Sequence, residues 1–288
     1  MLSPFRTQGA WIILSPIEQS IKQKIESIGT PLKNWDININ RGVLTGCNEA
    51  FIISTEKRDE ILANCKSEDE RSRTAELIRP ILRGRDIKRY GYEWANLWII
   101  ATFPSRQYDI EQFPAVKDYL LSFGIERLEQ TGATHIVNGA TINARKKTNN
   151  KWFETQDSIS YWDDFSKQQI VWIELSDEPK FALVEGITSA NTVFFMTGKM
   201  LPHILGLLNS KIITWYFQRC VGTTSGVGTN RWLKYTIEQI PLAPVSIKLI
   251  DLVNDLCEQY TEDKNKSIDK LVCELYSLSE SETHFFDS

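Results

Sequence analysis

The stretch "INRGVLTGCNEAFII", residues 39–53, places Gly42 and Gly46 directly ahead of a short apolar run. Glycines in this position can cradle a phosphate or form a tight turn. A P-loop needs Lys and then Ser or Thr after its second glycine, followed by a helix, whereas Cys47 and Asn48 follow here. The dinucleotide fingerprint needs three glycines between a strand and a helix. The stretch therefore predicts a structural turn that leads into a strand at 50–53.

The composition is that of a folded chain without membrane spans. Of 288 residues, 42% are hydrophobic and 11% aromatic, which is enough apolar material for one large domain or two of ordinary size. The longest apolar runs, such as "LWII" and "TVFFM", are far shorter than the roughly 18 residues of a spanning helix. The N-terminal sequence lacks the basic start and long apolar block of a signal peptide, so a cytoplasmic location is expected.

Cysteine and histidine usage gives no sign of a disulfide framework or a metal site. The five cysteines form no C-x-x-C pair, and the three histidines lie far apart in the sequence. Neither a zinc ribbon nor a His-based metal centre is expected.

Helix signals are clear at three places. Ser15, Pro16 and Glu18 form a capping-box pattern with proline at the first helical position, and Gly29 ends the isoleucine stripe that follows. Apolar residues at helical spacing predict further helices at 114–123 and 201–217.

Short runs of strand character lie between these helices, at 50–53, 97–103, 169–175, 181–184 and 192–196. No regular alternation of strands and helices links them, so the pattern favours an α+β fold with a mostly antiparallel twisted sheet and packed helices. After Pro244 two amphipathic stretches follow each other. We therefore expect a domain over residues 1–243 and a helical C-terminal subdomain or arm over 244–288.

Positive charge is concentrated in three segments, although the formal net charge is −4. These segments are "RPILRGRDIKR" at 79–89, "NGATINARKKTNNKW" at 138–152 and "GTTSGVGTNRW" at 222–232. Small hydroxyl side chains and free N–H groups in such loops can approach phosphate oxygens, while Arg and Lys supply the charge. Each segment alone could equally be a solvated surface loop, but three of them interleaved with Trp, Tyr and Asn favour nucleic-acid binding.

Several segments, in the same order along nearly the whole chain, resemble one protein family. They are "INRGVLTGCNEAFII", "ELIRPILRGRDIKRY", "LWII", "FPAVKDYLLSF", "KWFETQDSISYWDDFSKQQIVW", "ILGLLNSKIITWYF", "GTNRWLKYTIEQIPL" and "IDKLVCELYSLSESE". The ordered set resembles the C-terminal specificity domain of type IIG restriction-modification enzymes and of related adenine-specific DNA methyltransferases. The resemblance implies a target-recognition region that works with a methyltransferase or endonuclease domain or subunit. S-adenosylmethionine and Mg are then expected only in those catalytic parts, and no cofactor is expected in this chain.

We therefore expect sequence-specific binding of double-stranded DNA without catalysis by this chain. Phosphate contacts are expected from Lys146, Lys147, Arg231 and Lys234. Base contacts are expected from residues 131–150, where three side chains suit adenine or guanine edges, namely Asn138, Asn143 and Arg145. Further DNA-binding candidates in the basic segments and the opening turn are Arg41, Arg83, Arg85, Lys88, Lys151, Thr223, Thr224 and Ser225. For Arg83 and Arg85 a second interpretation is open, as buried partners of Asp86 that fix a turn.

Two other functions remain as alternatives. The amphipathic stretches after Pro244 could dock a catalytic partner chain, with DNA contact incidental. A weaker pattern, in which Asp164 precedes Glu178 and Lys180, is similar to the acids and lysine of a metal-dependent nuclease. Pro179 interrupts the strand that such a site needs, and the same residues suit a polar turn. The sequence holds no hydrolase, zinc-protease or amino-methyltransferase motif.

Overall fold

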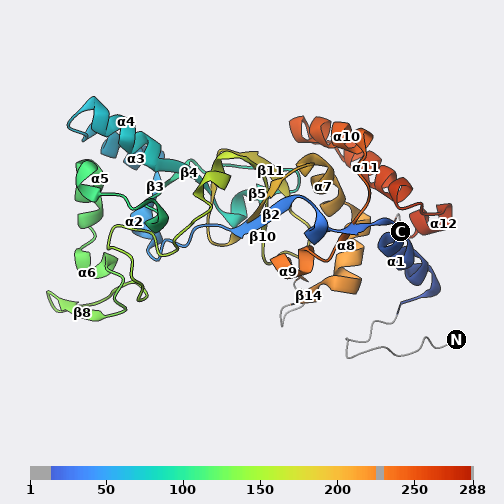
Figure 1. The fold of residues 1–288 in the computed structure, drawn as a ribbon, viewed down its shortest axis with the longest axis horizontal. Helices are drawn as coiled ribbons and strands as arrows, with labels where there is room; N and C mark the ends of the chain where they lie inside the picture. The colour runs from blue at the N-terminus through green and yellow to red at the C-terminus, as the bar shows by residue number, and fades with distance from the viewer. Residues whose placement is uncertain (1–13, 225–229, 287–288) are drawn as a thin grey trace. The chain divides into compact units, whose positions relative to one another are not determined.

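The computed structural model describes residues 14–224 and 230–286, without the side chains of 223 and 224. The chain divides into two compact units. Unit 1 contains the described residues of Met1–Asp36, Leu175–Pro179 and Pro202–Ser288, and unit 2 contains Ile37–Glu174 and Lys180–Leu201. This division differs from the one expected at residues 243 and 244, because the N-terminal helix folds with the C-terminal helices (Figure 1).

Unit 2 is built on two four-stranded sheets. The first has the order β11-β10-β13-β2 and is antiparallel throughout. The second has the order β12-β4-β7-β3, in which the short pair β12 and β4 is parallel and the other pairs are antiparallel. The strands are β2 (Ile37–Arg41), β3 (Ile52–Ser54), β4 (Ile78–Leu82), β7 (Leu97–Ile100), β10 (Gln168–Ile173), β11 (Ala182–Glu185), β12 (Thr188–Ser189) and β13 (Val193–Gly198). The expected α+β fold with mostly antiparallel strands is confirmed.

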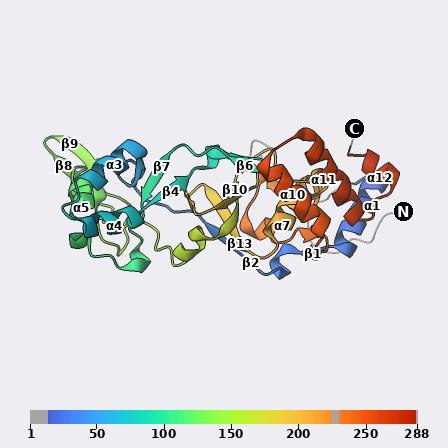
Figure 2. The same cartoon turned by 90° about the horizontal axis from the view of Figure 1, so that it is seen from above.

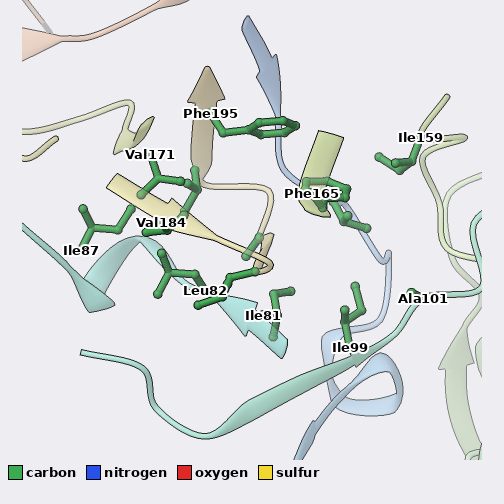
Figure 3. Packing of buried hydrophobic residues seen from close by; sticks show 14 of the residues in the cluster. Ile81, Leu82, Ile87, Ile99, Ala101, Ile159, Phe165, Val171, Val184 and Phe195 are labelled. Carbon is green, nitrogen blue, oxygen red and sulfur yellow. The ribbon is translucent and has the colours of Figure 1, made fainter. Parts of the chain in front are cut away.

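Buried side chains from both sheets meet in one core of unit 2 (Figure 3). Val171 and Phe195 come from the first sheet, Ile81 and Leu82 come from the second, and Phe165 enters from the 3-10 helix η5 (Trp162–Ser166). Fully burying each such side chain contributes roughly 1.5–3 kcal/mol. The core therefore holds the two sheets in one body and fixes the loops that leave them.

A second apolar cluster lies where the helices of unit 2 pack on β3, β4 and β7. Figure 1 shows α3, α4 and α5 gathered around β3 and β4. The helices are α2 (Asn48–Phe51), α3 (Thr55–Ala63), α4 (Glu68–Leu77), α5 (Pro114–Leu121) and α6 (Ile125–Leu128). α5 matches the helix expected at 114–123. α3 and α4 were not expected, because "TEKRDEILA" and "EDERSRTAEL" show little apolar periodicity, although Ser54 and Ser67 cap their N-termini.

Both glycines have a structural role, Gly46 at a bend and Gly42 in a close main-chain approach directly after β2. The Gly42 N–H donates to the Val193 carbonyl at 2.8 Å, and a Cβ at Gly42 would lie 2.2 Å from the carbonyl oxygen of Ala190. Gly46 has a φ of 75°, a conformation that glycine adopts without strain. The strand expected at 50–53 is partly wrong, because Phe51 ends α2 and β3 begins at Ile52.

Two further strand pairs lie in unit 2 and two in unit 1. In unit 2, β5 (Ile87–Lys88) pairs with β6 (Gly91–Tyr92), and β8 (Thr134–Val137) pairs with β9 (Ala140–Asn143). In unit 1, β1 (Thr30–Pro31) pairs with β16 (Pro241–Leu242), and β14 (Thr223–Thr224) pairs with β15 (Asn230–Arg231).

Helices make up most of unit 1 and enclose its apolar side chains. They are α1 (Pro16–Ile28), α7 (Leu201–Leu208), α8 (Lys211–Tyr216), α9 (Lys234–Ile237), α10 (Ile247–Glu258), α11 (Glu262–Leu275) and α12 (Glu280–His284). The capping box of α1 is present, with Ser15 and Glu18 in the expected roles. The helix expected at 201–217 is divided into α7 and α8, because Ser210 caps a new helix by accepting the N–H of Ile213. No helix in the described ranges is long and apolar enough to cross a membrane.

Both ends of unit 1 are joined by polar contacts. Lys24 of α1 donates to the Glu282 carboxylate of α12 at 2.6 Å. The Tyr276 hydroxyl accepts the Ala243 N–H at 2.9 Å and donates to the Pro241 carbonyl at 2.7 Å. The C-terminal helices are thus tied into unit 1 and do not form a separate arm.

The close approach at Gly42 predicts a large effect of a single methyl group. We expect Gly42→Ala to lower the free energy of unfolding by about 3 kcal/mol or more, since the clash is with main-chain atoms that cannot rotate away. Gly91→Ala is the control, because a Cβ at Gly91 meets no atom within 4 Å. Urea unfolding of both variants checks this expectation, and equal midpoints would contradict it.

Candidate nucleic-acid interface

The segment expected to read bases, residues 131–150, contains the β8–β9 hairpin. Its turn is Asn138-Gly139, with φ values of 51° and 82°, as in the type I′ turns that Asn-Gly favours. This sequence signal was present and could have predicted the hairpin. Ile136 on β8 is 80% exposed, and the hairpin lies at one end of unit 2 in both views (Figures 1 and 2). A two-stranded ribbon therefore replaces the expected loop.

Asn143, at the end of β9, is exposed and held from two sides. The Thr134 hydroxyl donates to its Oδ1 at 3.0 Å, and Arg127 donates to its main-chain carbonyl at 3.0 Å. Within the described part of the chain its Nδ2 group has no partner. Asn138 is also exposed, at the tip of the hairpin. Both side chains present amide donors to solvent.

Arg145 is not on this surface, although the sequence suggested that it reads bases. Its side chain is buried, with 2% exposure of the residue. The guanidinium donates to four main-chain carbonyls, those of Leu128 (2.7 Å), Thr45 (2.8 Å), Glu154 (2.8 Å) and Trp152 (2.6 Å). Four of its five N–H donors bind carbonyls inside the protein. We therefore assign Arg145 to anchoring the hairpin and not to contact with DNA bases.

Arg145 stays charged although it is buried. Burial lowers the pKa of its guanidinium to about 10, which still leaves it protonated at neutral pH. Its Cζ atom lies 5.0 Å from the centroid of the Phe51 ring, a cation–π distance. Gly46 completes the site, since a Cβ there would lie 2.9 Å from Cδ of Arg145.

The charges of Lys146 and Arg41, from distant parts of the sequence, both act on the carboxylate of Asp157. Burial raises the pKa of Asp157, while the charges of Arg41 and Lys146 both act to lower it. The Tyr161 hydroxyl donates to the Arg41 carbonyl at 2.8 Å. Arg41 itself is exposed and lies 3.7 Å from Glu174. The hydrogen bond from Arg145 to the Thr45 carbonyl brings together the opening turn and the basic run after the hairpin.

The remaining lysines of the basic run are exposed. Lys147 and Lys151 both point to solvent, and the Lys151 ammonium lies 5.5 Å from the Phe153 ring centroid. Together with Lys146 and Arg41 they supply the cationic side chains of a surface that we call the hairpin face, defined by Arg41, Asn138, Asn143, Lys146, Lys147 and Lys151.

The "RGRDI" segment resolves one open alternative. Arg83 forms a bidentate pair with Asp86, at 3.0 Å through Nε and 2.8 Å through Nη2. Burial disfavours the charged carboxylate, but hydrogen bonds from the side chain and backbone of Arg83 outweigh it and lower the pKa of Asp86. Arg83 therefore fixes a turn, whereas Arg85 is exposed and Lys88 lies 3.5 Å from Glu93.

The third basic segment belongs to unit 1. Trp232 is buried there and stacks on Phe217 with ring centroids 3.8 Å apart. Next to it, Arg231 is half-buried in β15, and Lys234 lies 3.8 Å from Glu238. Of the hydroxyl residues expected here, Thr223 and Thr224 form β14, and Ser225 lies outside the described residues.

The two acids of the alternative nuclease site have different hydrogen-bond partners and share none of them. Asp164 accepts from Asn40 at 3.3 Å and from Lys167 at 2.7 Å. Glu178 belongs to unit 1, where its main-chain carbonyl accepts from Ser176. In the described ranges no group of three His, Cys, Asp or Glu side chains could hold a metal ion.

The C-terminal helices offer few apolar side chains to a partner. Leu249, Val253 and Leu256 of α10 are fully buried within unit 1, as are Ile268 and Val272 of α11. The apolar spacing that suggested a docking surface is therefore explained by packing inside unit 1.

Comparison with known proteins identifies the fold and a family. Residues 79–242 match the model of the TaqI-like C-terminal specificity domain. Similar solved structures include the type IIL restriction-modification enzyme MmeI in complex with DNA, with a TM-score of 0.56 and 12% identity over 90% of this chain and 35% of that one. The type IIG restriction endonuclease BpuSI gives a TM-score of 0.55 and 13% identity over 93% of this chain and 33% of that one. A search of curated proteins gave no significant match. The chain thus spans about one third of the length of either enzyme.

The four carbonyl contacts of Arg145 predict that lysine cannot replace it. Lysine has three donors on a single nitrogen and no planar fork, so Arg145→Lys should leave buried carbonyls unpaired and cost on the order of 2–4 kcal/mol of unfolding free energy. Lys146→Ala, one residue away and exposed, should change it by less than about 0.5 kcal/mol. Urea unfolding decides, and a stable Arg145→Lys protein would refute the assignment.

Proposed function

Because the chain belongs to the family of TaqI-like C-terminal specificity domains, we propose that it recognises a specific sequence in double-stranded DNA for a restriction-modification enzyme. The observation that carries the proposal beyond the family is the hairpin face. It combines an exposed two-stranded ribbon with cationic side chains that are not buried. The major groove of B-DNA is wide enough to admit such a ribbon.

The two sides of the hairpin face suit different tasks. Lys146 and Lys147 are exposed point charges, which bind phosphates of any sequence and so set the position of the duplex. Asn138 and Asn143 carry amide groups that can donate to and accept from an adenine edge. Arg41, whose charge acts on the same Asp157 carboxylate as that of Lys146, is a further candidate for phosphate contact. Lys151, Arg85 and Lys88 are further phosphate-binding candidates in unit 2, and Arg231 and Lys234 in unit 1.

The catalytic work belongs to other parts of such an enzyme. We propose that a methyltransferase or endonuclease domain or subunit acts with this chain, and that it binds S-adenosylmethionine and Mg. A second contact surface on the duplex would then come from that partner. Binding by this chain alone should be correspondingly weaker.

Docking of a catalytic partner through the apolar faces of α10 and α11 is the less supported alternative. Those faces are buried against their own unit, so deleting residues 245–288 would remove core side chains of unit 1. Such a deletion cannot separate partner binding from DNA binding, and point variants are required for that purpose.

Enrichment from a pool of duplexes tests the proposal without knowledge of the target. The full chain should be incubated with double-stranded DNA that carries a randomised core of about 12 base pairs, a length that covers one helical turn. We expect one sequence to be enriched over successive rounds, and to bind at least about 10³-fold more tightly than scrambled duplex. Retention of DNA without enrichment of any sequence would refute sequence recognition.

Substitutions on the hairpin face should separate phosphate holding from base reading. Lys147→Ala should weaken binding about equally on the enriched and scrambled duplexes, and lower the slope of log K against log salt by roughly one. Asn143→Ala should cost roughly 1–3 kcal/mol on the enriched duplex only, since a bidentate contact is lost. A salt titration of both variants measures this. If neither variant changes binding, the hairpin face points away from DNA.

A further inference from the structure

Two arginine side chains lie at cation–π distance from the indole ring of Trp162. The guanidinium carbon of Arg106 is 3.8 Å from the ring centroid, and that of Arg79 is 5.8 Å from it. Arg106 also lies 5.8 Å from the ring centroid of Tyr108. These distances are those of cation–π contacts, and they place the two guanidinium carbons within about 10 Å of each other.

Three separate elements of unit 2 build this arrangement. Arg79 lies in β4, Trp162 begins η5, and Arg106 ends the 3-10 helix η3 (Pro104–Arg106). Ser105 ties η3 to the chain ahead of Trp162, since its N–H donates to the Ser158 carbonyl at 3.1 Å and its hydroxyl donates to the Ile159 carbonyl at 2.7 Å. The stack is therefore positioned by the fold and does not depend on one mobile loop.

The segment before Trp162 holds a strained residue that fixes its course. Ile159 has a φ of 50° and is 3% exposed. A β-branched residue in the left-handed region costs of the order of 1–3 kcal/mol and persists where its surroundings hold it. Here the Ile159 side chain packs in the core of unit 2, as Figure 3 shows.

The stack leaves the hydrogen-bonding edges of both guanidinium groups unused. Contact with an aromatic face uses the π surface of the guanidinium, and its five N–H donors lie in the plane at right angles to that contact. Arg83 and Arg41 each have a carboxylate partner. In the described ranges Arg79 and Arg106 have no ion pair or side-chain hydrogen bond. Two like charges within about 10 Å of each other, without a carboxylate partner in the described ranges, favour an anion beside them.

We propose that Arg79, Trp162 and Arg106 form a phosphate clamp that holds a backbone phosphodiester of the DNA duplex. The clamp rests on the proposed function, and it adds a contact outside the hairpin face. Trp162 is the positioning residue, because the cation–π contacts with its ring restrain both arginine side chains before the phosphate arrives. Arg106, the exposed member, provides the first contact.

The test compares charge-matched variants on the enriched and scrambled duplexes. Arg106→Gln and Arg79→Gln each remove one charge from the clamp. Arg71→Gln removes one charge from an exposed position on α4 and serves as the control. At about 0.1 M salt we expect each clamp variant to bind both duplexes roughly 3- to 10-fold more weakly, with a salt slope lower by roughly one, and the control to bind as the unaltered chain does. Trp162→Leu keeps both charges and should lose affinity by a smaller factor.

A second measurement reports contact at Arg106 itself. Phenylglyoxal modifies accessible arginine side chains, and mass spectrometry of the digested protein locates the modified residue. Duplex DNA should protect Arg106 and leave Arg71 reactive. Inorganic phosphate at the same ionic strength should protect Arg106 far less, because the clamp is proposed for a phosphodiester held by a whole duplex. Equal protection by inorganic phosphate would assign the site to a free anion and overturn the clamp.

The outcomes separate this inference from the proposed function. If the unaltered chain binds no duplex, both fail. If it binds and enriches a sequence while Arg106→Gln and Arg79→Gln bind as well as the control, with Arg106 unprotected, the clamp alone fails and the hairpin face remains.

Discussion

The hydrogen bonds of the Arg145 guanidinium hold together the end of unit 2 that carries the β8–β9 hairpin. The guanidinium receives no carboxylate partner and instead binds four main-chain carbonyls from three stretches that are distant in sequence: the opening turn, the end of α6 and the chain after the hairpin. A buried charge is tolerated only where its donors are satisfied. Loss of any of these carbonyl contacts would therefore destabilise the buried guanidinium. Gly46 is required beside it for space. Through Arg145 the exposed hairpin is anchored to the interior of unit 2.

Local rules gave the secondary structure with regular patterns but not the elements set by tertiary contacts. The capping box of α1 and the strands β7, β10, β11 and β13 could be predicted from the sequence, because caps and apolar runs are local signals. The apolar run predicts that Phe51 lies in a strand. In the structure Phe51 ends the short helix α2, which begins at Asn48, where the Thr45 hydroxyl donates to the side chain. In "ARKK" the three basic residues look alike in sequence. Only the fold separates the buried Arg145 from its exposed neighbours, since burial depends on residues far along the chain.

Four physical states are found among the cationic side chains of unit 2. Arg145 is buried on carbonyl oxygens, Arg83 is paired with Asp86, and the hairpin lysines stand in solvent. Arg106 represents a further state, in which the charge is held on an aromatic face with its donors unused. Net charge cannot distinguish these states, and for this reason an acidic chain can still present a basic surface. The sequence alone does not indicate a role for Arg106, because no other basic residue lies near it in the chain.

The pairing of β1 with β16 means that unit 1 is not continuous in sequence. Thr30 lies opposite Leu242, and the polypeptide of unit 2 runs between them. On the ribosome α1 emerges ahead of unit 2 but lacks its partners β16 and α12 until these have been made, whereas unit 2 has all of its strands well before that point. Since domains fold as units during synthesis, unit 2 can close early while the isoleucine stripe of α1 waits uncovered. The order of synthesis and the order of folding therefore differ, since α1 is made ahead of unit 2 and is buried after it.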